Sequence, residues 1–220
     1  MATDYVFDWE TVGPAPKGIV VELSYTPFID QPDNVPSFLE LVSRSRKYKF
    51  DIKAQKGTRI SDAGTIGWWK KQAPEAQAIL KPLPDDLTIS DGIGRFLTDL
   101  KADGIVFKES LEYCRGPEFD RSILVDVMRQ IKGENDVFDM LPVPFWNCRD
   151  IRTAIENRLL TRGLVNTPLP LGTLEGFIKH NSIHDCAKDV LMLIYALRYA
   201  YGIEQAPTGE NVDPLSIQIR

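Results

Sequence analysis

The order of strand-like and helix-like segments most restricts the fold of this 220-residue chain. Apolar, β-branched and aromatic residues predict strands at about 5–10, 19–25 and 48–53, and these three are expected to be antiparallel neighbours. Strand-like segments at 111–114 and 144–148 then alternate with helical patterns. This order predicts an α/β fold with a mixed five-stranded sheet flanked by helices.

Helical patterns cover the remaining segments. Residues 62–102 are interrupted by prolines and end in a helix from about 86 to 102, whose apolar face carries Ile89, Ile93, Phe96, Leu97 and Leu100. Asp150 is a suitable N-cap for a helix at 151–160, and a last helix ends near Tyr201. We therefore expect a single domain, 1–220, with a helical insert at about 62–102.

Cysteine usage and hydropathy exclude several classes of protein. Cys114, Cys148 and Cys186 are isolated and odd in number, which favours neither a disulfide framework nor a zinc site, and a reducing, cytoplasmic setting is expected. The N-terminus lacks the features of a secretory signal. The longest apolar run, 190–196, is far shorter than the roughly 20 residues of a membrane-spanning helix, so no membrane partner is expected.

Three acidic residues are candidates for metal binding because each is predicted at the end of an element. Asp8 and Glu10 end the first strand, where the two-residue period points both side chains to one face. Asp120 stands where a loop enters a helix, a place where a helix N-cap is an equally good interpretation. Such carboxylates suit Mg²⁺, although pairs like Asp8 and Glu10 are common among 31 acids.

A histidine and a further acid precede the last apolar helix. His184 is a candidate general base because the unperturbed pKa of imidazole is about 6.5, and Asp189 adjoins the apolar run at 190–196. His180 and Asp185 have the same spacing one turn earlier. We prefer the later pair, because packing of the apolar run would hold Asp189 rigidly against the sheet.

These residues resemble a known family when taken in order. Asp8-x-Glu10, Phe119-Asp120 and His184-x4-Asp189 resemble the motifs of the DEDDh exonucleases, which have a ribonuclease H-like fold. The segments 64–72, 114–120 and 146–153 more closely resemble the exonuclease A (DexA) branch of tailed phages. The resemblance covers nearly the whole chain.

The resemblance implies a role for each position. Asp8 would bridge two divalent ions, Mg²⁺ or Mn²⁺. Glu10 and Asp189 would complete one metal site and Asp120 the other. His184 would take a proton from the attacking water, releasing 5′-mononucleotides from the 3′ end of a single strand. Glu10 and the backbone near Thr11 would also contact the terminal 3′-hydroxyl.

Aromatic residues beside these motifs are candidates for substrate binding. Trp68 and Trp69 diverge by about 100° on a helix, so one is expected in the core while the other stacks on a base. Gln72, one turn away, and Phe119, beside Asp120, are the other candidates.

A net charge of −5 disfavours nucleic-acid binding, but one segment of the chain is a run of mostly basic residues. Its residues would follow a phosphate backbone or, alternatively, blunt the edge of a sheet. They are Arg44, Arg46, Lys47, Lys49, Lys53, Lys56 and Arg59.

The expected partner is single-stranded nucleic acid, with DNA preferred over RNA because of the resemblance to the phage enzymes. An exoribonuclease of the same fold and a catalytically inactive nucleic-acid-binding module are the alternatives. A phage origin would place the protein in the host cytoplasm. The sequence makes no prediction of the oligomeric state.

Overall fold

A mixed five-stranded sheet in the order β3-β2-β1-β4-β5 forms the centre of the molecule. The structure is a computed structural model that describes residues 2–217, so the two ends of the predicted 1–220 domain lie outside it. β1 (Asp4–Thr11), β2 (Val20–Phe28) and β3 (Arg46–Lys49) are antiparallel neighbours, as predicted, whereas β4 (Glu112–Cys114) and β5 (Cys148–Asp150) run parallel to β1.

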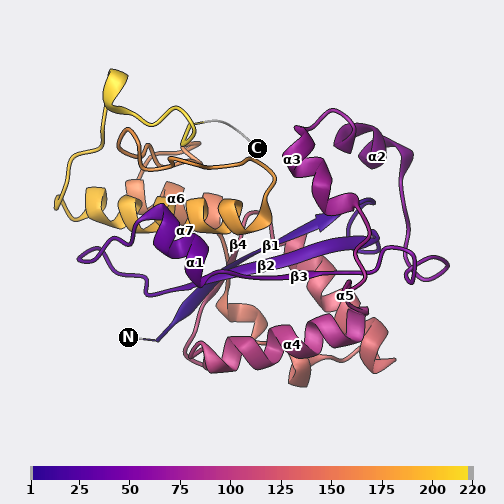
Figure 1. Cartoon of the computed structure of the whole chain (residues 1–220). Coiled ribbons are helices and arrows are strands. Elements are labelled where there is room, and N and C mark those ends of the chain that lie inside the picture. The colour runs from indigo at the N-terminus through magenta and orange to yellow at the C-terminus, as the bar shows by residue number, and fades with distance from the viewer. Residues whose placement is uncertain (1, 218–220) are drawn as a thin grey trace.

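Helices cover both faces of this sheet (Figure 1). One face contacts α7 (Ser182–Ala200), which packs on α6 (Ile151–Leu159) and on α1 (Phe38–Arg44). The other face carries α4 (Ile89–Ala102) and α5 (Asp120–Lys132). The predicted α/β fold with flanking helices is therefore confirmed.

Alternation along β1 separates the two hydrophobic cores. Tyr5, Phe7 and Trp9 are buried against the α4 and α5 layer. Val6 belongs to the core formed with α7, and the period of two places Asp8 and Glu10 on that same face. The strand that builds the sheet therefore also aims two acids toward the start of α7.

Two of the predicted strands have other bounds than expected. The strand expected at 48–53 ends at Lys49, because the Asp51 carboxylate accepts hydrogen bonds from the backbone N–H groups of Lys53 and Ala54 and closes a turn. The fifth strand begins at Cys148, since residues 145–147 form a 3-10 turn. Asp150 caps α6, as expected, by accepting from the backbone N–H of Thr153.

Short helices occupy the segment between β3 and α4. α2 (Ala63–Trp69) is capped by Asp62 and is followed by α3 (Pro74–Gln77) and a 3-10 turn at Ala78–Leu80. Figure 1 shows α2 and α3 beyond the end of β1. Among the described residues, no helix is long and apolar enough to cross a membrane.

Candidate active site

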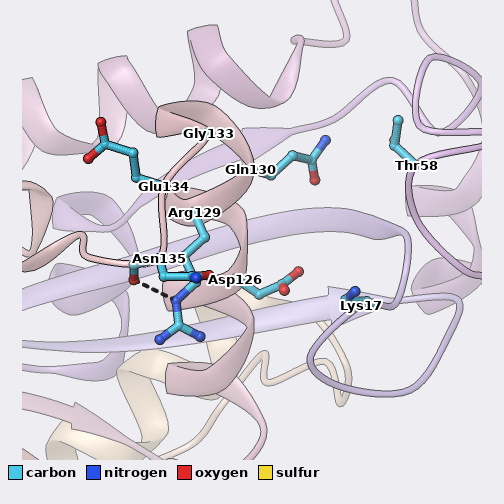
Figure 2. A pocket seen from close by; sticks show the side chains of 8 residues that line it. All are labelled: Lys17, Thr58, Asp126, Arg129, Gln130, Gly133, Glu134 and Asn135. Atoms are coloured by element: carbon cyan, nitrogen blue, oxygen red, sulfur yellow. Dashed lines mark hydrogen bonds between the residues drawn. The ribbon is translucent and has the colours of Figure 1, made fainter.

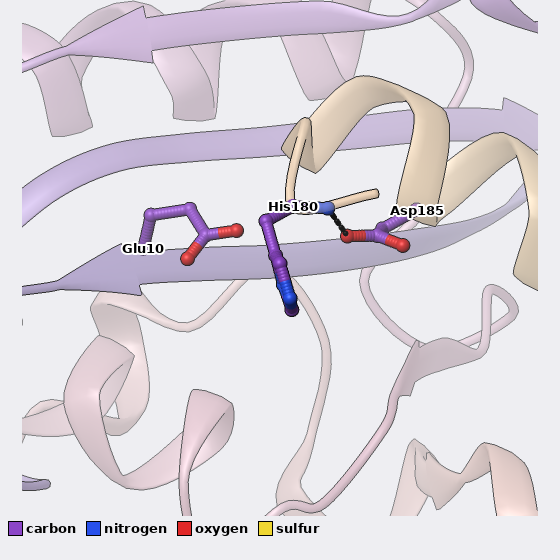
Figure 3. Close-up of side chains that lie close together, drawn as sticks. All are labelled: Glu10, His180 and Asp185. Carbon is purple, nitrogen blue, oxygen red and sulfur yellow. Dashed lines mark hydrogen bonds between the residues drawn. The ribbon is translucent and has the colours of Figure 1, made fainter. Parts of the chain in front are cut away.

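Glu10, His180 and Asp185 form a group at the C-terminal end of β1. One ligand atom of each residue lies within 4.8 Å of those of the other two. Figure 3 shows the Glu10 carboxylate on β1 facing the His180 side chain, with Asp185 on the first turns of α7. A strand and the start of a helix therefore bring together residues 170 positions apart.

The backbone of His180 is fixed in an unusual conformation. Its φ is 62°, in the left-handed region that residues other than glycine seldom occupy. The Asp185 carboxylate accepts a hydrogen bond from the backbone N–H of His180 at 3.1 Å, which holds the residue just before α7. The imidazole ring then lies against Trp68, with the ring centroids 4.8 Å apart.

Asp8 and Asp120 adjoin this group. Asp8 is half-buried on the same face of β1 as Glu10. The buried Asp120 carboxylate accepts from the backbone N–H of Trp9 at 3.1 Å, which attaches the start of α5 to β1 between its two acids. Three distant segments therefore direct four carboxylates toward the end of one strand. Oxygen donors of this kind are the ligands that Mg²⁺ and Mn²⁺ prefer, so the residues fit such a metal.

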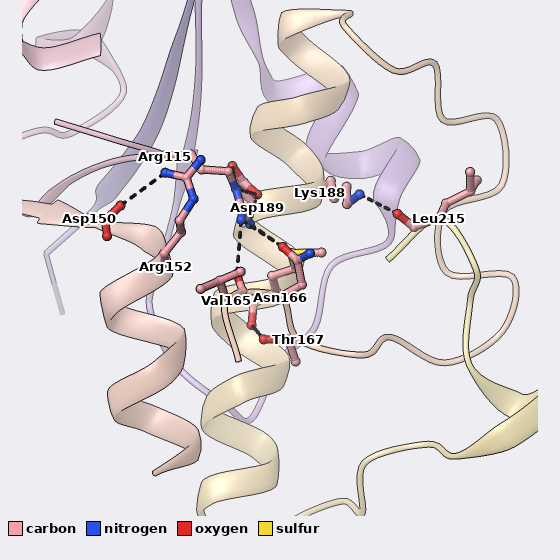
Figure 4. A network of polar contacts seen from close by, with 10 residues as sticks. Arg115, Asp150, Arg152, Val165, Asn166, Thr167, Lys188, Asp189 and Leu215 are labelled. Atoms are coloured by element: carbon pink, nitrogen blue, oxygen red, sulfur yellow. Dashed lines mark hydrogen bonds and ion pairs between the residues drawn. The ribbon is translucent and has the colours of Figure 1, made fainter. Parts of the chain in front are cut away.

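Asp189, the acid preferred in the sequence analysis, is engaged elsewhere. Its carboxylate forms a buried ion pair with Arg115, at 2.7 Å from Nη2 and 3.0 Å from Nε. Arg115 also donates to the Val165 carbonyl and the Asn166 side chain (Figure 4). Asp189 thus ties the loop after β4 to α7, and the geometry favours Asp185 over Asp189 as the acid beside Glu10.

His184 also differs from its expected place. It lies in the first turn of α7, where its Nδ1 accepts from the backbone N–H of Ile178 at 2.9 Å and its ring packs on Phe38 and Phe177. Burial lowers the pKa of His184, with opposing influence from Asp185. His184 therefore has a structural environment, and the geometry favours His180 as the histidine of the site.

A pocket of about 270 Å³ opens beside Glu10. Thr11, Trp68, Trp69 and Phe119 line it, so four of the five residues expected to bind substrate meet there. Trp69 is buried and donates from Nε1 to the Thr11 carbonyl, whereas 41% of Trp68 and 39% of Phe119 is exposed. The two tryptophans divide between core and surface, as the sequence analysis expected.

Gln72 is absent from the pocket lining. Its side-chain Nε2 donates to the Trp68 carbonyl at 3.0 Å, and its own carbonyl accepts from the Gln77 side chain at 2.8 Å. The residue therefore closes the C-terminal end of α2 and joins it to α3.

A buried carboxylate that the sequence analysis missed lies next to this group. Glu22 on β2 is the direct cross-strand partner of Glu10 and is only 1% exposed. Its carboxylate accepts from the Ser182 hydroxyl at the start of α7, and Lys47 Nζ lies 3.6 Å away. The polar residues at 22, 24 and 26 in an otherwise apolar strand were the available signal.

Most of the basic run is neutralised within the protein. Arg46 pairs with Asp103, Lys49 with Asp86 and the buried Arg59 with Asp126. Lys47 faces Glu22, which leaves only Arg44, Lys53 and Lys56 of this run exposed and without a described ion pair. The run therefore does not form the continuous phosphate-binding surface that was one of its two interpretations.

A separate depression of about 510 Å³ lies beside α5 (Figure 2). It is lined by Lys17, Thr58, Asp126, Arg129, Gln130, Gly133, Glu134 and Asn135, which include both signs of charge. None of the candidate site residues lines it. This depression is therefore separate from the group of candidate site residues at the end of β1.

Comparison with known proteins decides the family. Residues 3–196 match the model of the Rv2179c-like 3′–5′ exoribonuclease domain. The chain belongs to this family of exonucleases. The exonuclease is also 48% identical to the exodeoxyribonuclease of Enterobacteria phage T4, over 97% of each chain.

Solved structures show that this exonuclease has the ribonuclease H-like fold of DEDDh nucleases. The nuclease domain of 3′hExo, a DEDDh family member bound to rAMP, aligns over 96% of this chain and 97% of its own with a TM-score of 0.55 and 12% identity. S. pombe Pop2p in its Mg²⁺- and Mn²⁺-bound form aligns over 94% and 87%, with a TM-score of 0.54 and 13% identity. The predicted enzyme class, a 3′–5′ exonuclease, is confirmed.

Proposed function

We propose that this exonuclease hydrolyses single-stranded DNA from its 3′ end with two divalent metal ions, using Asp8, Glu10, Asp120 and Asp185 as ligands and His180 as general base. The convergence of Glu10, His180 and Asp185 beside an aromatic-lined pocket carries the proposal. His180 and Asp185 replace the pair preferred from the sequence.

The metal site draws its support from the donor set. Asp8 and Glu10 lie on one face of β1, Asp120 approaches from α5 and Asp185 from α7. Mg²⁺ or Mn²⁺ bound there supplies positive charge that stabilises the phosphate and the leaving oxygen and makes water a better nucleophile. The number of carboxylates, four from three segments of the chain, supports a pair of ions rather than one.

The side chains around the metal site then have distinct tasks. His180 takes the proton of the attacking water, because imidazole accepts a proton efficiently near neutral pH. Trp68 and Phe119 are placed to stack on the terminal base, while Glu10 and the backbone near Thr11 meet the terminal 3′-hydroxyl. An internal phosphodiester lacks that hydroxyl, which restricts cleavage to ends.

DNA is the favoured substrate because the phage T4 relative, named an exodeoxyribonuclease, matches nearly the whole chain. The three cysteines are free thiols, consistent with a reducing compartment, and we place the enzyme in the cytoplasm of a phage-infected host. We also treat the whole chain as one exonuclease domain.

Digestion of end-labelled oligonucleotides tests this function. Wild-type protein with Mg²⁺ should release a 3′ label first as a mononucleotide and should shorten a 5′-labelled DNA strand progressively, with matched RNA degraded more slowly. Glu10→Gln, assayed in parallel, should lose activity while remaining folded. Release of the 5′ label first, or equal activity of the variant, would overturn the proposal.

A further inference from the structure

Two exposed aromatic residues lie on the surface beside the edge strand of the sheet. Phe145 is 66% exposed and Trp146 is 56% exposed, with their ring centroids 4.9 Å apart. The turn that carries them is held firmly, because the Asn147 side chain donates to the carbonyls of Lys108 and Ser110. Large apolar rings on a well-anchored surface indicate a binding role rather than loose packing.

Two arginines continue this surface, Arg149 in β5 and Arg152 in the first turn of α6. Arg149 is exposed and anchored through Nη1 to the carbonyls of Trp146 and Cys148, and among the described residues it forms no ion pair with a carboxylate. Arg152 lies 3.9 Å from Asp150, whose other carboxylate oxygen is engaged in capping α6. These positive charges are less neutralised than those of the basic run.

The surface leads back to the active site. A Cβ atom on Gly116 would lie 3.4 Å from Arg152 Nη1, so Arg152 adjoins the loop after β4. Within that loop the Gly116 carbonyl accepts from the backbone N–H of Phe119 at 2.8 Å. Phe119 lines the pocket that contains Glu10. Figure 4 shows Arg152 beside Arg115 at this junction.

We propose that Arg152, Arg149, Trp146 and Phe145 form a β5 edge track that binds the single strand upstream of its 3′-terminal nucleotide. Basic and aromatic side chains that alternate along a surface hold single strands without sequence preference. Arginine contacts the phosphates, and the aromatic rings stack on the nucleobases. Among the described residues no strand pairs with the outer edge of β5, and this strand alone spans about 10 Å, so the track extends the site beyond the terminal nucleotide. The inference rests on the proposed function, whose substrate it extends.

A comparison of short and long substrates tests the track. In the double variant Trp146→Ala/Arg149→Ala, the KM for an oligonucleotide of about 20 nucleotides should rise about tenfold. The KM for an oligonucleotide of about 4 nucleotides should stay unchanged, as should kcat for either substrate. The dependence of log KM on log salt should also become shallower by about 0.7, the slope of one lost phosphate contact on a single strand. Arg152→Ala should act in the same direction.

The control removes one exposed aromatic residue and one exposed arginine elsewhere, as Tyr201→Ala/Arg95→Ala, and should change neither KM. Binding of a fluorescent 20-nucleotide strand in EDTA measures the track independently of hydrolysis, so an inactive wild type would contradict the proposed function and leave the track testable. Unchanged binding in Trp146→Ala/Arg149→Ala would overturn the track and favour a protein partner or simple protection of the sheet edge. Equal KM changes for both substrate lengths would overturn it as well.

Discussion

His180 combines a strained backbone with a place among acids. Its φ of 62° costs about 1 kcal/mol for a residue with a Cβ atom, and such strain is typical of functional positions. His180→Gly should therefore keep or raise the free energy of unfolding while lowering kcat by about 10²–10⁴, because the general base is lost. Denaturant unfolding and single-strand digestion measure the two effects.

Leu160 offers a matched control for that substitution. Its φ is 51°, it is 91% exposed at the end of α6, and it lies outside the site. Leu160→Gly should change the free energy of unfolding, relative to wild type, by about as much as His180→Gly does, and should leave kcat unchanged. If His180→Gly unfolded more easily than wild type, the left-handed backbone would not be a source of strain.

Asp4 provides a pH dependence that is independent of the active site. Burial raises the pKa of Asp4 to about 6, with Asp30 adding to the shift and the bond from the Leu111 N–H opposing it. The native state thus binds this proton more tightly than the unfolded chain does. The stabilisation of the fold by protonated Asp4 is therefore complete below pH 4 and is lost as pH rises through 6. Relative to wild type, Asp4→Asn should gain about 2–3 kcal/mol of unfolding free energy between pH 4 and 7.

Asp139 serves as the control, because its pKa is lowered whereas that of Asp4 is raised. The Lys132 ammonium holds the pKa of this exposed carboxyl below its usual range. Asp139→Asn should therefore lose stability relative to wild type above pH 4, and the loss should fade as pH falls. A parallel pH dependence of the unfolding free energy in the two variants would show that burial does not control the pKa of Asp4.

The sequence predicted the residue types of the site but not which histidine belongs to it. His180 and His184 each precede an aspartate by five positions, so spacing alone cannot separate them. The choice depends on where α7 begins, and the structure begins it at Ser182 after the N-cap Asn181. Asn and Ser favour helix starts, and this was the signal that placed His180 outside the helix.

At the scale of elements, the start of α5 depends on a buried ion pair. Arg121, next to Asp120, donates to Glu112 on β4, which also accepts from the Tyr5 hydroxyl and is fully buried. Arg121→Met leaves the Glu112 charge without its partner and should cost about 3–5 kcal/mol of unfolding free energy. Chemical denaturation measures this loss, and Lys132→Met, at an exposed ion pair, should change it little. Equal losses would contradict the role of burial.

Long elements with a clear period were predicted well, whereas the short elements α1 and β5 were not. α1 was missed although Ser37 and Glu40 form a capping box, because a seven-residue helix has too few turns for a clear apolar stripe. β5 begins four residues later and ends two residues later than the expected 144–148, because the 3-10 turn at 145–147 precedes it. Its three residues owe their conformation to pairing with β4, a tertiary effect.

At the scale of the whole molecule, metal binding should be coupled to folding stability. The acids at the end of β1, with Glu22 directly opposite Glu10, should repel one another in the metal-free protein, and a cation bound there would offset that repulsion. Mg²⁺ at 100 times its Kd should add about 2.7 kcal/mol, seen as a higher Tm than in EDTA. Glu10→Gln/Asp185→Asn should lose most of this shift. A full shift in that variant would place the metal elsewhere.

The comparison of His180→Asn with His184→Asn tests the central claim most directly, because His180 faces Glu10 whereas His184 accepts from the backbone N–H of Ile178. The measurement is kcat for a 3′-labelled single-stranded DNA at saturating Mg²⁺, normalised to folded protein. We predict a loss of about 10²–10⁴ for His180→Asn and a change of less than about tenfold for His184→Asn. The reverse order would contradict the assignment of His180 and Asp185 to the active site.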